Sequence, residues 1–156
     1  MPNATAADAE IVLKLFELRR EEVMRKARNF MVMDFWPQSV DEILAVMNAR
    51  GTQENAYFRQ VLTFYEMAST LPLHGAVNSD LFAEWNGELL FLFATFEPFL
   101  VELREKSGNT GMLGNCERYI QSSPLAQKKL VPVTQRVANM SAAMRPKGKP
   151  AKKAKK

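Results

Sequence analysis

Few residues in this sequence have types and spacings that could do chemistry. A di-iron site in a helical bundle is built from Glu-x-x-His pairs and further carboxylates, but this sequence has one histidine, His74, and no such pair. Cys116 is the single cysteine, and a helix and a glycine-rich segment separate it from His74, so nothing marks the two as a nucleophile with its base. Phosphate-binding glycine motifs are also missing. We expect no catalytic residue, no metal and no cofactor.

Polar residues interrupt the most apolar stretch of the chain. Trp85-Asn86-Gly87-Glu88 stands within residues 78–106, which are otherwise rich in Leu and Phe. A buried polar group without a partner destabilises the fold by about 1–3 kcal/mol, so these residues need partners. We expect Asn86 and Glu88 to form a partly buried cluster with Arg59 and Glu66 of the preceding helix. The other available partners are Tyr65, Arg19 and Arg25. A structural network is the expectation, and a ligand site is its alternative.

The C-terminal tail is the second candidate site, because its charge differs from that of the body. Residues 1–117 hold 10 Lys or Arg and 17 Asp or Glu, a net charge of −7, whereas residues 118–156 hold 11 Lys or Arg and no acid. The basic residues of the tail itself are Arg145, Lys147, Lys149, Lys152, Lys153, Lys155 and Lys156. They could neutralise phosphates without sequence preference, since no aromatic residue is interleaved with them. Anionic lipid is an alternative partner, and a tail that folds back on the acidic body is another.

The elements that must position these residues are helices. Trp85, Leu89, Leu92, Phe96, Phe99 and Leu103 follow at steps of 4, 3, 4, 3 and 4, which places them on one face of a central helix over about residues 78–106. Pro98 predicts a kink in it. Gly87 predicts a close approach by another helix, and approach of the backbone to a ligand is the alternative. A helix from Thr52 to Pro72 precedes it across a short connection, so the two should form an antiparallel hairpin.

Three longer helices and a short one around Cys116 to Ile120 complete the prediction. The first runs from Thr5 to about residue 34, and a short one follows from Ser39 to Gly51. Ser123-Pro124 begins a third, which Pro132 should interrupt. Its remaining part is amphipathic and could dock on the body or fold on a partner.

Composition favours one domain and a tail. We expect an all-α helical bundle organised on the central antiparallel helical hairpin at 1–121, an accessory amphipathic segment at 122–144 and a disordered Lys-rich tail at 145–156. The longest apolar run, from Leu89 to Phe96, is too short to span a bilayer, and the first residues lack the pattern of a signal peptide. With a single cysteine, a cytoplasmic protein is the expectation.

Several short motifs resemble those of a family of small helical bacterial proteins that carries only a label of unknown function. They are Leu18-Arg19-Arg20-Glu21, Tyr57-Phe58-Arg59, Phe64-Tyr65-Glu66-Met67-Ala68, His74-Gly75-Ala76-Val77, Leu81-Phe82, Asn86-Gly87-Glu88, Pro98-Phe99 and Glu102-Leu103-Arg104. The resemblance covers about residues 10–120 and leaves out the basic tail. It implies an all-α fold of unassigned role and transfers no catalytic residue.

The functional expectation is a non-catalytic interaction or regulatory protein. Ten Phe, two Trp, three Tyr and nine Met are many for a chain of this length, and helices with broad apolar stripes often complete their burial in a homo-oligomer or with a protein partner. The first alternative is a protein that associates with nucleic acid through the tail. The second alternative is an enzyme with a site near Asn86 and Glu88.

Overall fold

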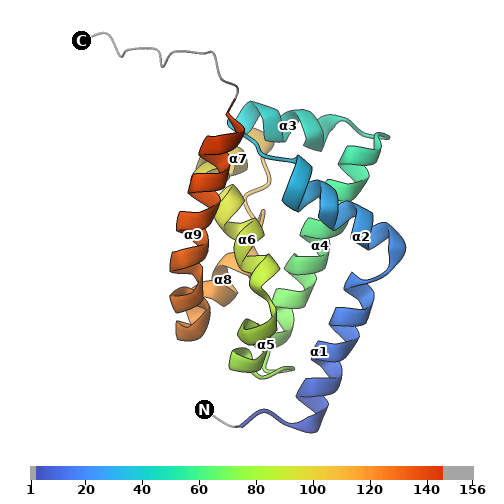
Figure 1. The fold of residues 1–156 in the computed structure, drawn as a ribbon, viewed down its shortest axis with the longest axis vertical. Helices are drawn as coiled ribbons and strands as arrows, with labels where there is room; N and C mark the ends of the chain where they lie inside the picture. Colours follow the sequence, from blue (N-terminus) through green and yellow to red (C-terminus); the bar gives the residue numbers. More distant parts are fainter. Residues whose placement is uncertain (1–2, 146–156) are drawn as a thin grey trace, which may run out of the picture.

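The protein is a bundle of helices arranged around α4, Gln53–Leu73 (Figure 1). The computed structural model describes residues 3–145, and within that range it contains helices and no strands. The chain descends through α4 and returns in the opposite direction through α5 and α6, which confirms the predicted hairpin (Figure 1). The other elements are α1 Ala6–Arg19, α2 Glu22–Asn29, a π-helical turn Phe30–Asp34, α3 Val40–Asn48, α5 Ser79–Trp85, α6 Gly87–Phe96, a 3₁₀ turn Glu97–Phe99, α7 Leu100–Ser107, α8 Gly114–Ser122 and α9 Pro124–Met144.

Side chains that cap the helices fix where several of them begin. Thr5, Ser39, Thr52, Asn78 and Ser123 each accept a hydrogen bond from a backbone N–H in the first turn of the helix that follows. These contacts satisfy N–H groups that have no partner inside the helix. The predicted starts of α1, α3, α4 and α9 are therefore confirmed.

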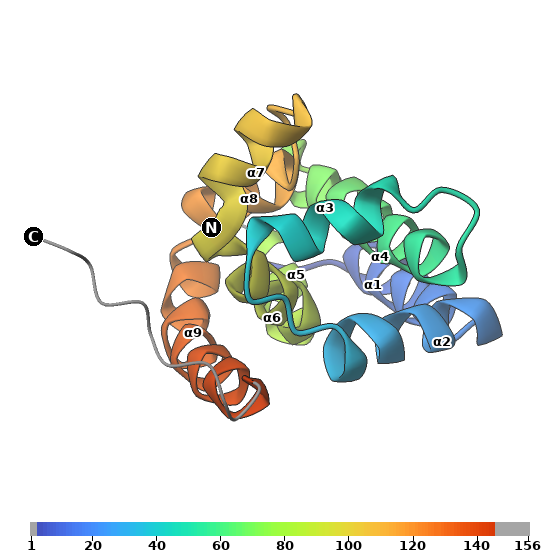
Figure 2. The ribbon, with the colours of Figure 1, turned by 90° about the horizontal axis from the view of Figure 1, so that it is seen from above.

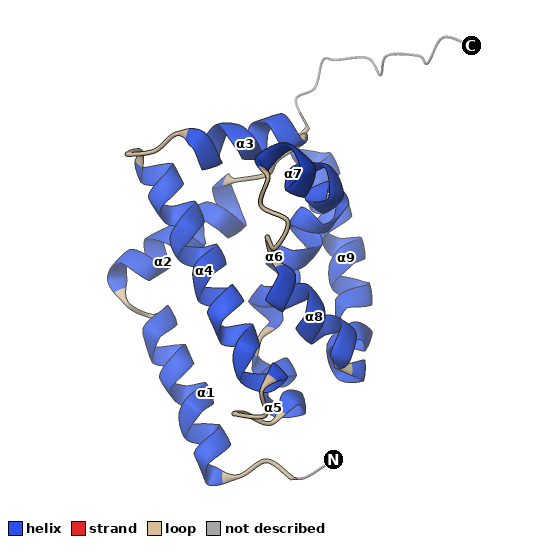
Figure 3. Cartoon of the chain, turned by 180° about the vertical axis from the view of Figure 1, so that it is seen from behind, coloured by secondary structure: helices blue, strands red, loops and turns tan. Residues whose placement is uncertain are grey.

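The predicted single helix from Thr5 to about residue 34 is wrong. α1 ends at Arg19, and the chain turns before α2 begins at Glu22. The reason is the Glu21 carboxylate, which accepts hydrogen bonds from the backbone N–H groups of Val23 and Met24 at 3.0 and 2.9 Å and so caps a new helix. α1 and α2 meet at this corner (Figure 3).

The central apolar stretch is also divided. The backbone leaves the helical region at Asn86, with φ −98° and ψ 39°, so α5 ends at Trp85 and α6 begins at Gly87. A Cβ atom built at Gly87 meets no atom within 4 Å, so the predicted close approach by another helix is wrong. The irregularity predicted near Pro98 is the 3₁₀ turn Glu97–Phe99.

α9 is continuous through Pro132, so the predicted interruption there is wrong. A proline inside a helix removes one backbone hydrogen bond, but packing on both sides of Pro132 keeps the helix continuous through it. Ala126 and Val137 are buried against the body, and α9 lies along α6 (Figures 1 and 2).

The core gathers around α6, every residue of which from Leu89 to Phe96 is buried. Phe96 and Phe58 of α4 contact edge to face, with ring centroids 5.9 Å apart, and Phe35 lies within 6.3 Å of both rings. A smaller apolar cluster of Phe91, Ala94 and Val137 lies between α6 and α9.

Candidate functional site

Glu88 belongs to the predicted polar cluster. It lies in the first turn of α6 and forms an ion pair with Arg28 of α2. Arg28 donates through Nε to Glu88 Oε1 at 2.6 Å and through Nη2 to Oε2 at 2.5 Å. The two side chains are 21% and 14% exposed, so most of this ion pair is removed from water. A bidentate pair of this kind fixes orientation as well as charge. It therefore sets the position of α2 against α6.

Tyr65 of α4 completes the network from the opposite side. Its hydroxyl donates to Glu88 Oε1 at 2.7 Å, so one carboxylate joins α2, α4 and α6. Burial, and then the charge of Glu88, raise the pKa of Tyr65 above its ordinary value. The hydrogen bonds that Arg28 donates to Glu88 raise the pKa of Arg28. We call Arg28, Tyr65 and Glu88 the buried network.

Sequence reasoning named Tyr65 and missed Arg28, which is 60 residues from Glu88 in the chain. A signal was present, because Met24, Ala27, Arg28 and Met31 fall at i, i+3, i+4 and i+7. That spacing places the arginine within the buried stripe of α2, where Met24, Ala27 and Met31 are almost fully buried. An arginine in such a stripe requires an acid partner.

Asn86 is 2% exposed and lies at the break between α5 and α6. Neither its amide nitrogen nor its carbonyl oxygen has a hydrogen-bond partner among residues 3–145. The Nε atom of Arg19 and the indole nitrogen of Trp85 are likewise buried without a partner in that range. The Arg19 guanidinium lies 5.5 Å from the ring centroid of Trp85 and 5.5 Å from that of Phe16, an arrangement that favours a cation.

Arg59 and Glu66 lie on another side of α4. The Glu66 carboxylate accepts hydrogen bonds from the backbone N–H groups of Asn115 and Cys116, both at 3.2 Å, and so caps α8. Arg59 is exposed and lines the same pocket as Glu66. The structure therefore places the predicted residues in three settings: Glu88 in the buried network, Asn86 at the helix break, and Arg59 with Glu66 beside α8.

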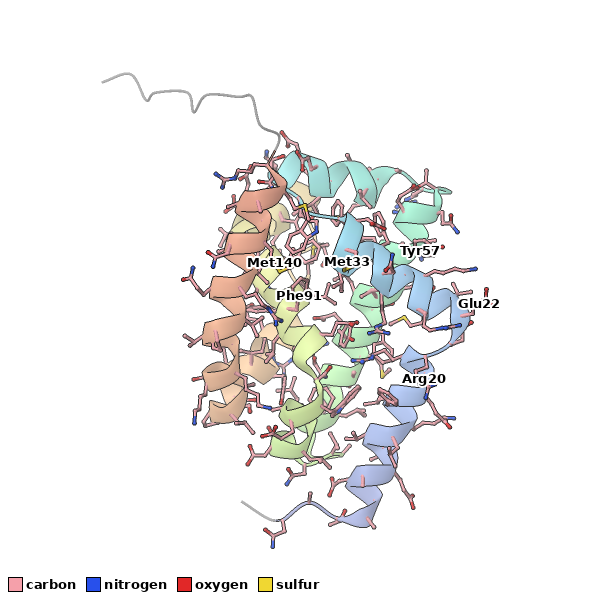
Figure 4. All side chains as sticks on the ribbon, viewed as in Figure 1. Arg20, Glu22, Met33, Tyr57, Phe91 and Met140 are labelled. Atoms are coloured by element: carbon pink, nitrogen blue, oxygen red, sulfur yellow. The ribbon has the colours of Figure 1, made fainter. Side chains whose placement is uncertain are left out.

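The outer face of α1 exposes large apolar side chains at the edge of the bundle. Ile11, Val12 and Leu15 point inward and pack on the core, yet Leu13 and Phe16 are 64% and 39% exposed. Apolar residues thus occupy both sides of α1. The Arg20 guanidinium lies 5.7 Å from the ring centroid of Phe16, and Figure 4 shows Arg20 at the α1–α2 corner. We define Glu10, Leu13, Phe16 and Arg20 as the α1 outer face.

The charged members of the α1 outer face have no ion-pair partner within the described part of the chain. The ion pair of α1 joins Lys14 to Glu17, and Glu10 and Arg20 take part in none between residues 3 and 145. Both are exposed. The face therefore offers Leu13 and Phe16 with an acid toward one end and a base at the other, and the exposed Lys14–Glu17 pair lies beside them.

Cys116 is not an exposed nucleophile. It is 1% exposed, burial raises the pKa of its thiol, and Ser69 Oγ lies 3.5 Å from its sulfur. His74 is exposed after the last turn of α4. Residues 3–145 contain no group of three or more His, Cys, Asp or Glu side chains placed to hold a metal ion.

The predicted nucleic-acid-binding tail falls almost entirely outside the described residues. Of its members only Arg145 is described, and it donates through Nε to Gln38 Oε1 at 3.2 Å. The prediction for Lys147, Lys149, Lys152, Lys153, Lys155 and Lys156 lies beyond residue 145. Across the described range, none of the helices combines the length and the hydropathy required to cross a bilayer.

Comparison with protein families gives a match over most of the chain. The domain of unknown function DUF4760 matches residues 4–122, which include every element from α1 to α8 and exclude α9. Comparison with curated proteins found no match, and neither did comparison with solved structures. The matched range contains the buried network, the α1 outer face and the pocket beside α8. Since the match covers more than half of the chain, the protein belongs to the DUF4760 family.

Proposed function

We propose that this protein is a non-catalytic interaction protein that associates with a second copy of itself through the α1 outer face. The observation that carries the proposal is the exposure of Leu13 and Phe16 on a helix whose inner side is already packed. Exposed apolar residues grouped on one face are typical of interaction surfaces. A cytoplasmic setting is part of the proposal, because the only cysteine is buried and pairs with none.

The α1 outer face is complementary to itself, which favours a second copy of this chain, related by a two-fold axis, over an unrelated partner. Two copies of α1 can cross antiparallel about a point between Leu13 and Phe16, which places Leu13 of one copy against Phe16 of the other. Glu10 and Arg20 lie about 7 and 8 Å along the helix from that point, on opposite sides of it. Glu10 of each copy therefore comes opposite Arg20 of its partner, as a two-fold interface requires.

The expected association is weak. One pair of short helices buries less surface than the roughly 1,200 Å² of a standard interface, so we expect a dissociation constant on the order of 10–100 µM. Sedimentation velocity across that concentration range measures it. Replacement of Leu13 and Phe16 together by Lys should give a monomer at all concentrations.

A control variant tests whether the association depends on the α1 outer face or on exposed apolar residues in general. Val131 is 71% exposed on α9, and α9 lies at the opposite edge of the bundle from α1 (Figure 1). Val131→Lys should leave the association unchanged. A wild-type protein that stays monomeric at about 500 µM would refute the proposal.

Nucleic-acid association is the second candidate. From Pro124 to Met144 the basic residues are Lys128, Lys129 and Arg136, and α9 contains no acidic residue. Lys129 is paired with Glu84, so Lys128 and Arg136 are the α9 cations that would add to the charge of the Lys-rich tail at phosphates. A DNA and RNA binding assay at several salt concentrations should compare the full chain with one that ends at Met144. Equal binding by the two chains at low salt would contradict this candidate.

The catalytic alternative near Asn86 and Glu88 has the least support. Glu88 is paired with Arg28, and Asn86 is buried. Neither residue lines either of the two pockets described for the molecule. These observations favour a structural role for both.

A further inference from the structure

A pocket of about 610 Å³ lies on the side of α4 that carries Arg59 and Glu66. Its walls come from α4, from the turn between α3 and α4, and from the loop between α7 and α8, which Figure 3 shows beside α4. Phe58, Leu62 and Met112 supply apolar surface, and Arg50 and Arg59 supply cationic groups. The volume is within the range of pockets that bind small molecules.

Polar contacts hold the loop wall of this pocket in place. Arg104 of α7 donates through Nε and Nη2 to the carbonyl oxygen of Met112, at 3.0 and 2.8 Å, and through Nη2 to Glu117 at 2.8 Å. On the other side, Glu66 of α4 caps α8 through two backbone N–H groups. The loop is therefore held to α7 through Met112, and α8, into which it runs, is held to α4 through Glu66.

The same loop contains a strained residue that lines the pocket. Leu113 has φ 53° and ψ 23°, and it is the one non-glycine residue with positive φ between residues 3 and 145. A leucine in this region is unfavourable because its Cβ crowds the following carbonyl oxygen. Such strain persists only where surrounding contacts impose it, and it is concentrated at binding sites.

Arg50 and Arg59 differ from the arginine of the buried network because they have no acid partner. Both are exposed, and neither forms an ion pair with any residue from 3 to 145. Glu66 is the one acid that lines the pocket, and its carboxylate faces the N-terminal N–H groups of α8. The lining therefore carries two positive charges and one negative, a net charge of +1. Residues 3–145 as a whole carry 15 Lys or Arg against 17 Asp or Glu, a net charge of −2.

We propose that this pocket binds a small organic anion, with a carboxylate or phosphate head at Arg50 and Arg59 and an apolar body against Phe58, Leu62 and Met112. Planar guanidinium groups match both kinds of oxyanion, and two of them at one pocket favour an anionic ligand over a neutral one. The apolar surface selects a ligand with a hydrocarbon or aromatic body over a bare inorganic ion. This inference is independent of the self-association proposed above, because α1 contributes nothing to the pocket.

Titration with octanoate, octyl phosphate and uncharged 1-octanol, followed by amide NMR shifts, tests the proposal on the full chain. At least one of the two anions should bind, with shifts at Thr63, Asn109 and Gly111, which line the pocket. The tighter anion identifies the head group. 1-Octanol should bind at least about tenfold more weakly, because it lacks the charge that the arginines recognise.

Two variants and one control locate the binding. Arg50→Gln and Arg59→Gln should each weaken the anion by about tenfold, and both positions are exposed, so the fold should tolerate the changes. Arg25→Gln, at an exposed arginine of α2 outside this pocket, should leave binding unchanged. Failure of both anions to bind, equal binding of 1-octanol, or unchanged affinity in the Arg50→Gln/Arg59→Gln double variant would each overturn the proposal.

Discussion

On the inner side of the α1–α2 corner, Arg28 is held by both oxygens of Glu88, Tyr65 hydrogen-bonds to the same carboxylate, and Leu15 is 4% exposed. On the outer side, Leu13 is 64% exposed, and neither Glu10 nor Arg20 forms an ion pair within residues 3–145. The side chains on one side of this segment are therefore buried and paired, whereas those on the other side are exposed and form no ion pair within residues 3–145. Groups on the inner side should govern stability, and groups on the outer side should govern association.

The largest expected effect is at Glu88. Glu88→Gln leaves the mostly buried charge of Arg28 without its partner, so we expect a loss of about 3 kcal/mol in the free energy of unfolding, measured by urea denaturation. Glu17→Gln is the control, because the Lys14–Glu17 pair is exposed and should contribute little. A Glu88→Gln protein as stable as wild type would show that the buried network does not hold α2 against α6.

A pair of leucines two residues apart compares the two sides directly. Leu15→Ala removes buried methyl groups and should destabilise the protein by about 2–3 kcal/mol. Leu13→Ala, on the exposed side, should change stability by less than about 0.5 kcal/mol. Equal losses in the two variants, by thermal or urea unfolding, would contradict the assignment of inner and outer faces.

The smallest effect concerns pH and the hydroxyl of Tyr65. Since its pKa is raised in the folded protein, the folded state favours the neutral phenol. The stability that this confers is complete below the ordinary tyrosine pKa of about 10 and decreases above it, by up to about 1.4 kcal/mol per pH unit.

Tyr65→Phe should cost about 1–2 kcal/mol at pH 7, because it removes a hydrogen bond to a carboxylate. That difference from wild type should shrink as pH rises above 10, measured by urea unfolding at several pH values. If the stability difference between wild type and Tyr65→Phe stayed constant up to pH 11, the Tyr65 hydroxyl would not have a raised pKa in the folded protein. Burial also raises the pKa of Tyr119, to about 12. Its contribution to the pH dependence of stability is the same in wild type and Tyr65→Phe, so it cancels in the difference.

Much of the fold could be predicted because its determinants are local. Thr5, Ser39, Thr52 and Ser123 mark helix starts through contacts with residues three positions away. The breaks at Glu21 and Asn86 were missed, since Glu21 lies inside a run of helix-favouring residues and Asn86 inside an apolar stripe. At Pro132 the sequence predicts a break that is absent, because packing against α6 outweighs the hydrogen bond that the proline removes.

The site was less accessible to sequence reasoning. Helical spacing could have placed Arg28 inward, but its pairing with Glu88 depends on how α2 crosses α6. The pocket beside α8 depends on the path of the loop around Leu113, whose backbone conformation no leucine favours. Contacts between residues 60 positions apart, and strained loop conformations, depend on tertiary packing. Local sequence patterns therefore do not predict them.

A charge exchange on the α1 outer face is the most direct measurement of the proposed self-association. Glu10→Arg and Arg20→Glu should each weaken the dimer in sedimentation velocity, because each places like charges opposite one another across the two-fold axis. The double variant Glu10→Arg/Arg20→Glu restores opposite charges and should recover dimerisation to within about threefold of wild type. A double variant that stays as weak as the single ones, or single variants that dimerise like wild type, would contradict association through this face.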